Sequence, residues 1–463
     1  MRHGIHPARL TRSWRAHRLA AALLLSVVWV AGCTGSSATT ARGTATPRGT
    51  ATLAGVVSDC LIPPVSCYAP HLFQVEYGIQ SLLDRGIDGR GETVTVLAPA
   101  PSPSTPSPSA PSRSGPANPA PGGFPAATDI RQDLAAFDSM FQLAAAPIQV
   151  VTSLAGAGSP WQATGDEIQD IEIVHAVAPA ATLRVVLLPA NVADSAATAT
   201  AGLLAGLRLA VSGTDVAVIS FILGEHYFTR AQVAQMHSIL LGADAHHVTV
   251  IAGSGDNGGF SDAAFGGTAV KEVSLPASDP LVLAAGGTTL TGNPAGVAYI
   301  GETAWNGEAG LVLSSGASGG GFSHLYARPA YQDGVHGIST MRGVPDVAGD
   351  ADEKGGWPFV FTSGGKRSII QAFGTSASAS LWGGLMALAD QYAHHDLGFV
   401  NPAIYRIGRG SGYHEAFHDI TTGSNIVNTP PVGMGGYQAG AGWDPVTGWG
   451  TPDAQVLVPL LAA

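Results

Sequence analysis

The chain has 463 residues, of which 45% are hydrophobic and only 12% are charged, and its formal net charge is −11. This composition supplies a large apolar core and excludes wholesale disorder. The acidic balance argues against a nucleic-acid partner, because proteins that bind nucleic acids carry basic patches. Large α/β enzymes often exceed the average domain length, so we expect one monomeric domain over residues 56–463.

The first residues have the pattern of an export signal. Five arginines precede an apolar run over residues 19–30, which is too short for a comfortable membrane span. Cys33 follows an Ala-Gly pair, as in a bacterial lipobox, so we predict a signal peptide over residues 1–32 and a lipid on Cys33. Residues 33–55 are rich in Ser, Thr, Ala and Gly and read as a flexible tether. This pattern predicts a protein on the extracellular face of the cell membrane; simple secretion with an unmodified Cys33 is the alternative.

Two further features precede the main body of the domain. Cys60 and Cys67 flank six residues in an exported chain, which favours a local disulfide over two free thiols. Residues 98–126 are rich in Pro and Ser without periodicity, so we expect a solvated insertion that builds no core.

Apolar strands and helical patterns alternate along the chain. The predicted strands are 93–97, 148–151, 183–187, 216–220 and 248–252, and the predicted helices are 130–141, 167–177, 197–211 and 232–243. Nearly continuous apolar strands separated by helices indicate an α/β fold with a doubly wound, mostly parallel sheet that is covered on both faces.

Ser376 is the strongest candidate nucleophile. It lies in Gly374-Thr375-Ser376-Ala377-Ser378, at the start of an apolar run. A serine at a helix N-terminus can present its hydroxyl to a peptide carbonyl. Gly, Ser and Thr are also ordinary cap residues, so this segment alone is weak evidence.

Asp166 and Asp170 are the candidate proton carriers. They are four residues apart in Gly165-Asp166-Glu167-Ile168-Gln169-Asp170, so they share one face of a helix. Like charges near a buried site push one carboxyl group to keep its proton, and such a pair can accept a serine proton at acidic pH. The alternative is that acids in a first helical turn only complement the helix dipole.

Asp256 follows the predicted strand 248–252, in a Gly-rich turn. A protonated carboxylic acid there could donate a hydrogen bond to an oxyanion, which again requires an acidic working pH. The alternatives are that Asn257 is the donor, or that Asp256 only organises an Asx turn.

These segments together resemble the sedolisins, the serine-carboxyl peptidases with a subtilisin-like fold. The resemblance rests on Gly374-Thr375-Ser376, on Asp170-Ile171-Glu172 with Ala178-Pro179, and on Gly255-Asp256. It implies an acidic serine-type endopeptidase that acts on polypeptides, with Ser376 as nucleophile, Asp166 as base, Asp170 as its partner and Asp256 as oxyanion donor. Asp166 departs from the family, which has the longer glutamate at that position.

The resemblance extends to a cation site and a substrate cleft. Sedolisins bind one Ca²⁺ through two Asp side chains and three backbone carbonyls, which here implies a C-terminal calcium-binding loop. The implied ligands are Asp419, Ile420, Gly440, Gly442 and Asp444. The Gly-rich segment 318–321 resembles a loop beside the family's cleft, where it would allow close approach to an extended substrate. A Gly-rich loop held by Asx turns is the alternative for the cation loop.

A second function fits some of the same residues. Asp166, the aliphatic residues 221–223 in the cleft strand and the short tether, where sedolisins commonly carry a long pro-domain, suggest a surface lipoprotein that binds peptides without cleaving them. Acid hydrolysis of a peptide would distinguish the two.

Overall fold

The computed structural model describes most of the chain after the predicted tether. The described residues are 56–57, 67–98, 130–152, 165–188, 192–261, 265, 268–292, 299–307, 316–363, 365–429 and 432–463. They belong to one compact unit that spans residues 53–463. The predicted signal peptide, Cys33, the tether, Cys60 and residues 99–126 of the insertion lie outside the described residues. Within them, no helix has both the length and the apolar character needed to cross a membrane.

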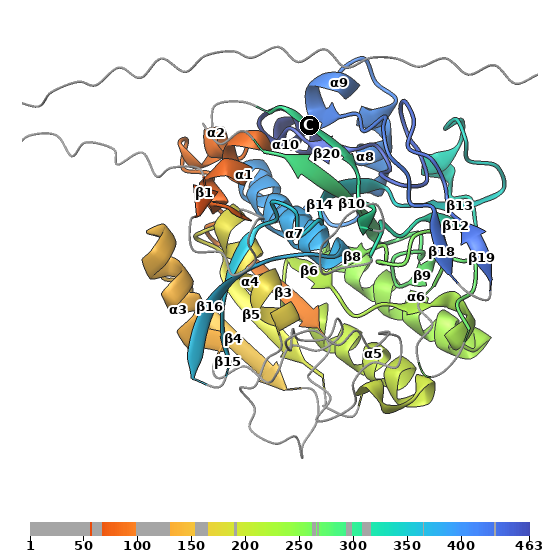
Figure 1. Ribbon diagram of the computed structural model, residues 1–463, viewed down its shortest axis with the longest axis horizontal. Coiled ribbons are helices and arrows are strands. Elements are labelled where there is room, and N and C mark those ends of the chain that lie inside the picture. Colours follow the sequence, from red (N-terminus) through yellow and green to blue (C-terminus); the bar gives the residue numbers. More distant parts are fainter. Residues whose placement is uncertain are drawn as a thin grey trace, which may run out of the picture. The chain divides into compact units, whose positions relative to one another are not determined.

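A mostly parallel sheet runs through the centre of this unit (Figure 1). In the described residues it has eight strands, in the order β11-β10-β8-β6-β3-β5-β4, with β14 also paired to β10. The strands are β3 (Thr93–Ala98), β4 (Ile148–Thr152), β5 (Thr182–Leu187), β6 (Val216–Ile219), β8 (Thr249–Gly253), β10 (Leu283–Thr291), β11 (Gly301–Ala304) and β14 (Val347–Asp350). Only the β10–β11 pair is antiparallel. This arrangement confirms the predicted α/β fold.

Helices cover both faces of the sheet. The first apolar core is formed with α1 (Pro70–Glu76), α3 (Ile130–Phe141), α4 (Gly165–Val177), α7 (Thr375–Ala393) and α10 (Ala454–Leu461). The second is formed with α5 (Ala196–Ala210) and α6 (Arg230–Ala245). Side chains of β6 alternate between them: Val216 and Val218 join the first core, and Ala217 and Ile219 join the second. Burial on both faces is the reason why these strands are continuously apolar.

The remaining elements are short and lie around this framework. The helices are α2 (Gln80–Leu83), α8 (Asn401–Gly408) and α9 (Tyr413–Ala416), with 3₁₀ turns η1 (Val192–Asp194), η2 (Glu225–Tyr227) and η5 (Ala330–Gln332). The strands form antiparallel pairs: β1 (Val56–Val57) with β2 (Cys67–Tyr68), β7 (Leu223–Gly224) with β9 (Ser274–Leu275), β12 (Gly321–Ala327) with β13 (Met341–Val344), β15 (Pro358–Ser363) with β16 (Lys366–Gln371), β17 (Phe417–His418) with β20 (Thr451–Pro452), and β18 (Val427–Thr429) with β19 (Gly433–Gly435).

The predicted helices and strands are confirmed, with small shifts at their ends. The helix expected over 232–243 begins at Arg230, because Thr229 and Gln232 form a reciprocal capping box. The helix expected from residue 167 begins at Gly165, so both Asp166 and Glu167 lie in its first turn. Acidic side chains there complement the positive end of the helix dipole.

Helix α7 packs directly against α4, and small residues make this possible. A Cβ atom at Gly384 would lie only 2.6 Å from the Cβ atom of Val177, so any larger residue would push the two helices apart. Since α4 carries Asp166 and α7 carries Ser376, this close packing brings the candidate acids and the candidate nucleophile to the same region.

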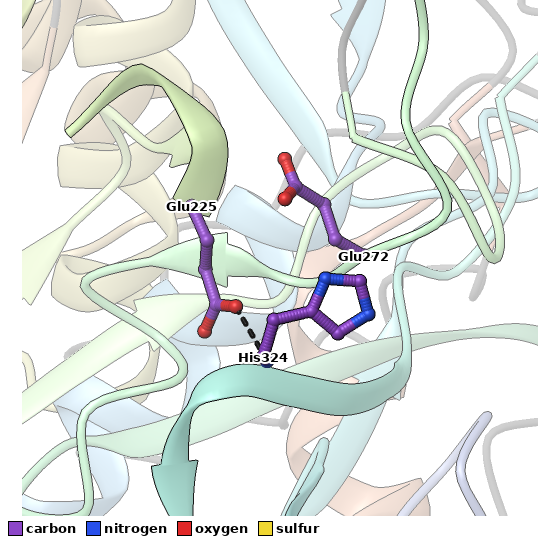
Figure 2. A group of neighbouring side chains, drawn as sticks. All are labelled: Glu225, Glu272 and His324. Carbon is purple, nitrogen blue, oxygen red and sulfur yellow. Dashed lines mark hydrogen bonds between the residues drawn. The ribbon is translucent and has the colours of Figure 1, made fainter.

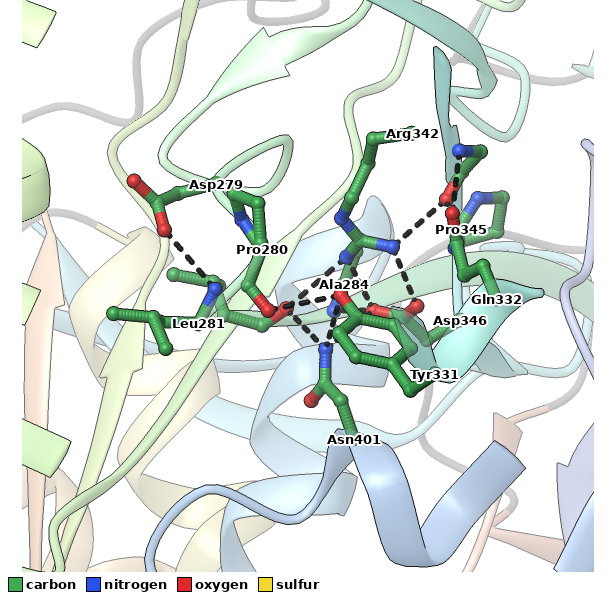
Figure 3. Close-up of polar contacts among 12 residues, drawn as sticks. Asp279, Pro280, Leu281, Ala284, Tyr331, Gln332, Arg342, Pro345, Asp346 and Asn401 are labelled. Carbon is green, nitrogen blue, oxygen red and sulfur yellow. Dashed lines mark hydrogen bonds and ion pairs between the residues drawn. The ribbon is translucent and has the colours of Figure 1, made fainter. Parts of the chain in front are cut away.

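A buried ion pair ties the sheet to α8 (Figure 3). The Arg342 Nη2 atom lies 2.7 Å from Asp346 Oδ2, and both side chains are fully buried. The same Asp346 oxygen accepts a hydrogen bond from the Ala284 N–H of β10 at 2.8 Å, and Asp346 Oδ1 accepts one from the Tyr405 hydroxyl of α8, also at 2.8 Å. Loss of either charge would leave the other buried and unpaired, which is strongly destabilising. Arg342 and Asp346 thus have a structural role.

Candidate active site

Ser376 is the second residue of α7, and its side chain is partly exposed. The Gln169 side-chain amide donates a hydrogen bond from Nε2 to Ser376 Oγ at 3.0 Å. The same amide is bound at both ends by Phe373, whose carbonyl accepts from Nε2 at 3.1 Å and whose N–H donates to Oε1 at 3.2 Å. Because these two bonds fix which end of the amide faces the serine, Ser376 Oγ is the acceptor. Its own proton therefore remains available to a base.

The two candidate proton carriers of α4, Asp166 and Asp170, have raised pKa values. Burial raises the pKa of Asp166 to about 6, and the charge of Asp256 adds to this effect. Burial also raises the pKa of Asp170 to about 7; the hydrogen bond from the Ser220 hydroxyl opposes this shift, and the charge of Asp166 reinforces it. The hydroxyl of Ser220, directly after β6, donates to Asp170 Oδ2. Because the charge of one carboxylate raises the pKa of the other, the pair loses its two protons in separate steps and holds a single proton between them.

Asp256 lies at the N-terminus of α7. Its Oδ1 atom accepts hydrogen bonds from the Thr375 N–H and the Thr375 hydroxyl, both at 2.8 Å. The Thr375 hydroxyl also accepts from the Gly255 N–H at 3.1 Å. Asp256 thereby caps the helix that carries Ser376. A Cβ atom at Gly374 would lie 3.0 Å from Asp256 Oδ2, so the glycine leaves room for this second carboxyl oxygen.

The fold therefore brings together the four residues that the sequence singled out: Asp166, Asp170, Asp256 and Ser376. Asn257, the alternative oxyanion donor, is exposed, and Glu167, the acid next to Asp166, is fully buried. Sequence reasoning assigned no role to Gln169, Thr375 or Ser220. Gln169 directly precedes Asp170, but its hydrogen-bond partner Ser376 is 207 residues away. Local sequence patterns do not predict such a distant contact.

The expected cleft segments also lie near this site. Phe221 and Leu223 are buried in the second core, whereas Ile222 is partly exposed and its Cδ1 atom would lie 3.6 Å from a Cβ atom at Gly255. The glycines of segment 318–321 make close contacts within the protein itself. A Cβ atom at Gly319 would lie 2.4 Å from the Ser254 carbonyl oxygen, and one at Gly320 would lie 2.0 Å from that of Pro445. These two glycines therefore join the Asp256 turn to the C-terminal loop.

Four of the five residues of the expected cation loop come together, namely Asp419, Gly440, Gly442 and Asp444, and the fifth, Ile420, is buried. Asp444 accepts hydrogen bonds from the N–H groups of Gly440, Val446 and Thr447 at 2.8–3.0 Å. Asp419 accepts from the Gly442 N–H at 3.1 Å. Two carboxylates thus contact one short segment of backbone. Burial raises the pKa of Asp444 to about 6, in spite of these hydrogen bonds.

Comparison with known proteins identifies the group to which this arrangement is related. The chain is 35% identical to kumamolisin of Bacillus sp. (strain MN-32) over 324 residues, which cover 66% of the chain and 53% of kumamolisin. It is 33% identical to sedolisin of Pseudomonas sp. (strain 101) over 270 residues, which cover 57% of the chain and 44% of sedolisin. It thus matches about half the length of these relatives. The chain matches no protein-family model.

The structural comparison agrees. The solved structure of Pseudomonas sedolisin, a serine-carboxyl proteinase in complex with pseudo-iodotyrostatin, superposes with a TM-score of 0.66 and 26% identity, over 85% of this chain and 98% of that one. The chain is therefore a relative of the serine-carboxyl peptidases. Its homologues are the sedolisins, and it shares their fold.

Proposed function

We propose that this protein is an acidic serine-type endopeptidase in which Ser376 is the nucleophile. The observation that carries the proposal is the hydrogen bond from Gln169 to Ser376 Oγ, made by the same helix that carries two acids with raised pKa values. It orients the hydroxyl without occupying its proton. The likeness to kumamolisin and sedolisin supports the same activity.

In the proposed mechanism, Ser376 Oγ attacks the carbonyl carbon of a peptide bond, and its proton passes to Asp166. Asp170 holds its own proton and so limits the repulsion between the two acids. The oxyanion receives a hydrogen bond from Asp256, which for this step must carry a proton on Oδ2, the oxygen that is not bound to Thr375. When the C–N bond breaks, Asp166 returns the proton to the leaving amine. Water then attacks the acyl-enzyme and gives a proton to Asp166. Asp166 returns this proton to Ser376 Oγ as the carboxylic acid product leaves.

A peptide aldehyde tests this proposal, because a serine nucleophile adds to an aldehyde to form a hemiacetal. We expect hydrolysis of an unstructured peptide at about pH 6, between the fully protonated and fully ionised states of the acid pair. With a ¹³C-labelled peptide aldehyde, a hemiacetal resonance should appear and should be absent from Ser376→Ala. Peptide binding without hydrolysis and without the resonance would contradict the proposal and favour a peptide-binding protein.

We further propose that the C-terminal loop holds one Ca²⁺. The ligands would be the Asp419 and Asp444 carboxylates and the carbonyls of Ile420, Gly440 and Gly442. An all-oxygen set with two carboxylates suits this hard cation. The N–H groups of segment 440–442 bring both carboxylates beside this segment, and a cation would offset the cost of burying an ionised Asp444.

Removal of Ca²⁺ should destabilise the fold. At about pH 7, above the pKa of Asp444, we expect a calcium-selective chelator to lower the melting temperature by several degrees, since a ligand at 100-fold its Kd contributes about 2.7 kcal/mol. Added Ca²⁺ should restore the melting temperature of the wild type. It should not raise the melting temperature of Asp444→Asn. A melting temperature that does not respond to the chelator would mean that Asp419 and Asp444 hold no cation.

The sequence also supports export. We propose that the protein reaches the extracellular face of the membrane and that Cys33 carries a lipid, because an Ala-Gly-Cys sequence follows a basic and then an apolar segment. Its partners would be polypeptide substrates outside the cell.

A further inference from the structure

Three side chains from separate segments meet at a second site (Figure 2). Glu225 follows β7, Glu272 precedes β9 and His324 belongs to β12. Each offers one ligand atom, and these atoms all lie within 4.8 Å of one another. None of the three takes part in the proposed peptidase chemistry.

The two carboxylates are buried, and one oxygen atom of each lies within 4.8 Å of the other. Glu225 is 2% exposed and Glu272 is 5% exposed. Burial raises the pKa of Glu225 and the charge of Glu272 adds to this rise, while hydrogen bonds from the Ser323 hydroxyl and the His324 N–H act in the opposite direction. Among the described residues, neither carboxylate forms an ion pair with Lys or Arg. Lys271 adjoins Glu272 in sequence, but its ammonium lies 5.6 Å from the centre of the Tyr437 ring.

A histidine supplies the third donor of the cluster. His324 is exposed, and one of its ring nitrogens lies within 4.8 Å of a carboxylate oxygen of each glutamate. A second histidine, His226, contacts the cluster from outside: its Nδ1 atom lies 2.5 Å from Glu272 Oε1, and its side chain is 31% exposed. The cluster thus combines two carboxylates with one imidazole.

The arrangement is also held in place by the backbone. The His324 N–H donates to Glu225 Oε2 at 2.7 Å, and the Ser323 hydroxyl donates to Glu225 Oε1 at 2.5 Å. A Cβ atom at Gly224 would lie 2.6 Å from both Glu272 Oε1 and Ser261 Cβ, so the glycine leaves room for this carboxylate. Side chains positioned in this way need little rearrangement to bind a ligand.

We propose that Glu225, Glu272 and His324 bind a divalent transition-metal ion such as Zn²⁺, with the His226 Nδ1 atom holding the Glu272 carboxylate in place. Mixed imidazole and carboxylate donors suit Zn²⁺, whereas Ca²⁺ and Mg²⁺ prefer oxygen donors alone. Two buried carboxylates without a Lys or Arg partner gain a compensating charge when the ion binds. The ion would connect η2, the segment before β9 and β12, so its role is structural.

Metal binding to the full chain tests this proposal. Calorimetric titration with Zn²⁺ should be made at about pH 7, where free imidazole is mostly neutral, with Ca²⁺ in excess to fill oxygen-only sites. We expect one Zn²⁺ ion per chain to bind tightly and to raise the melting temperature. Co²⁺ bound in its place should give the visible absorption of a low-coordinate site.

Two variants locate the ion. His324→Ala, at an exposed position, should lower the affinity for Zn²⁺ by about 10-fold or more, and Glu272→Gln should do the same. His336→Ala removes an exposed histidine outside the cluster and should bind Zn²⁺ as the wild type does. The proposal is overturned if the wild type binds no Zn²⁺ tightly, or if His324→Ala binds Zn²⁺ with the affinity of the wild type. Neither result bears on Ser376, so the peptidase proposal is tested separately.

Discussion

Ser376→Ala is expected to reduce peptide hydrolysis at acidic pH by about 10³-fold or more, because it removes the atom that forms the acyl-enzyme. The stability of the protein should change little. Ser376 is partly exposed, and the Gln169 amide that it releases remains bound to the Phe373 backbone. Initial rates with an unstructured peptide and melting curves of both proteins measure the two effects.

Ser378 provides a matched control on the same helix. It is fully buried, and its hydroxyl has no hydrogen-bond partner among the described residues, so Ser378→Ala removes the same atom without touching the site. We expect this variant to keep wild-type activity. If Ser376→Ala cleaves the peptide as fast as the wild type, Ser376 is not the nucleophile.

Asp170→Ala is expected to reduce the rate by about 10²–10⁴-fold, the usual contribution of general acid–base catalysis. The pH profile should separate this role from a structural one. In the wild type, kcat/KM should rise as the pH passes the Asp166 pKa of about 6, because the base becomes ionised. It should fall as the pH passes the Asp170 pKa of about 7, because the second acid loses its proton. The fall that belongs to Asp170 should be missing from the residual activity of Asp170→Ala.

Asp166→Glu is the informative counterpart. It keeps the charge and adds one methylene group of reach toward Ser376, so we expect activity equal to or above that of the wild type. Asp166→Ala should lose activity as Asp170→Ala does. An inactive Asp166→Glu beside an active wild type would show that the site depends on the shorter side chain. If Asp166→Ala remains fully active, another group is the base.

Much of this molecule could be predicted from local patterns. The strand at 216–219 is continuously apolar, the strand at 93–98 alternates threonine with apolar residues at its start, and the helix at 130–141 is amphipathic. Each pattern indicates the type of element, because it matches the faces that the element buries. The spacing of Asp166 and Asp170 places them on one face of a helix, and the small residues around Ser376 are typical of a helix start. These features depend on neighbours within a few residues, which is why the sequence alone reveals them.

Contacts between distant segments were decided only by the tertiary structure. The Gln169 amide reaches Ser376 because glycines such as Gly384 let α7 pack closely on α4. Glu225, Glu272 and His324 meet because β7 pairs with β9 and the Glu225 carboxylate binds the backbone of β12. Gly319 and Gly320 fit against Ser254 and Pro445. Each of these contacts depends on how whole helices and strands pack and pair, and hydrophobic periodicity carries no information about which distant residues are brought together.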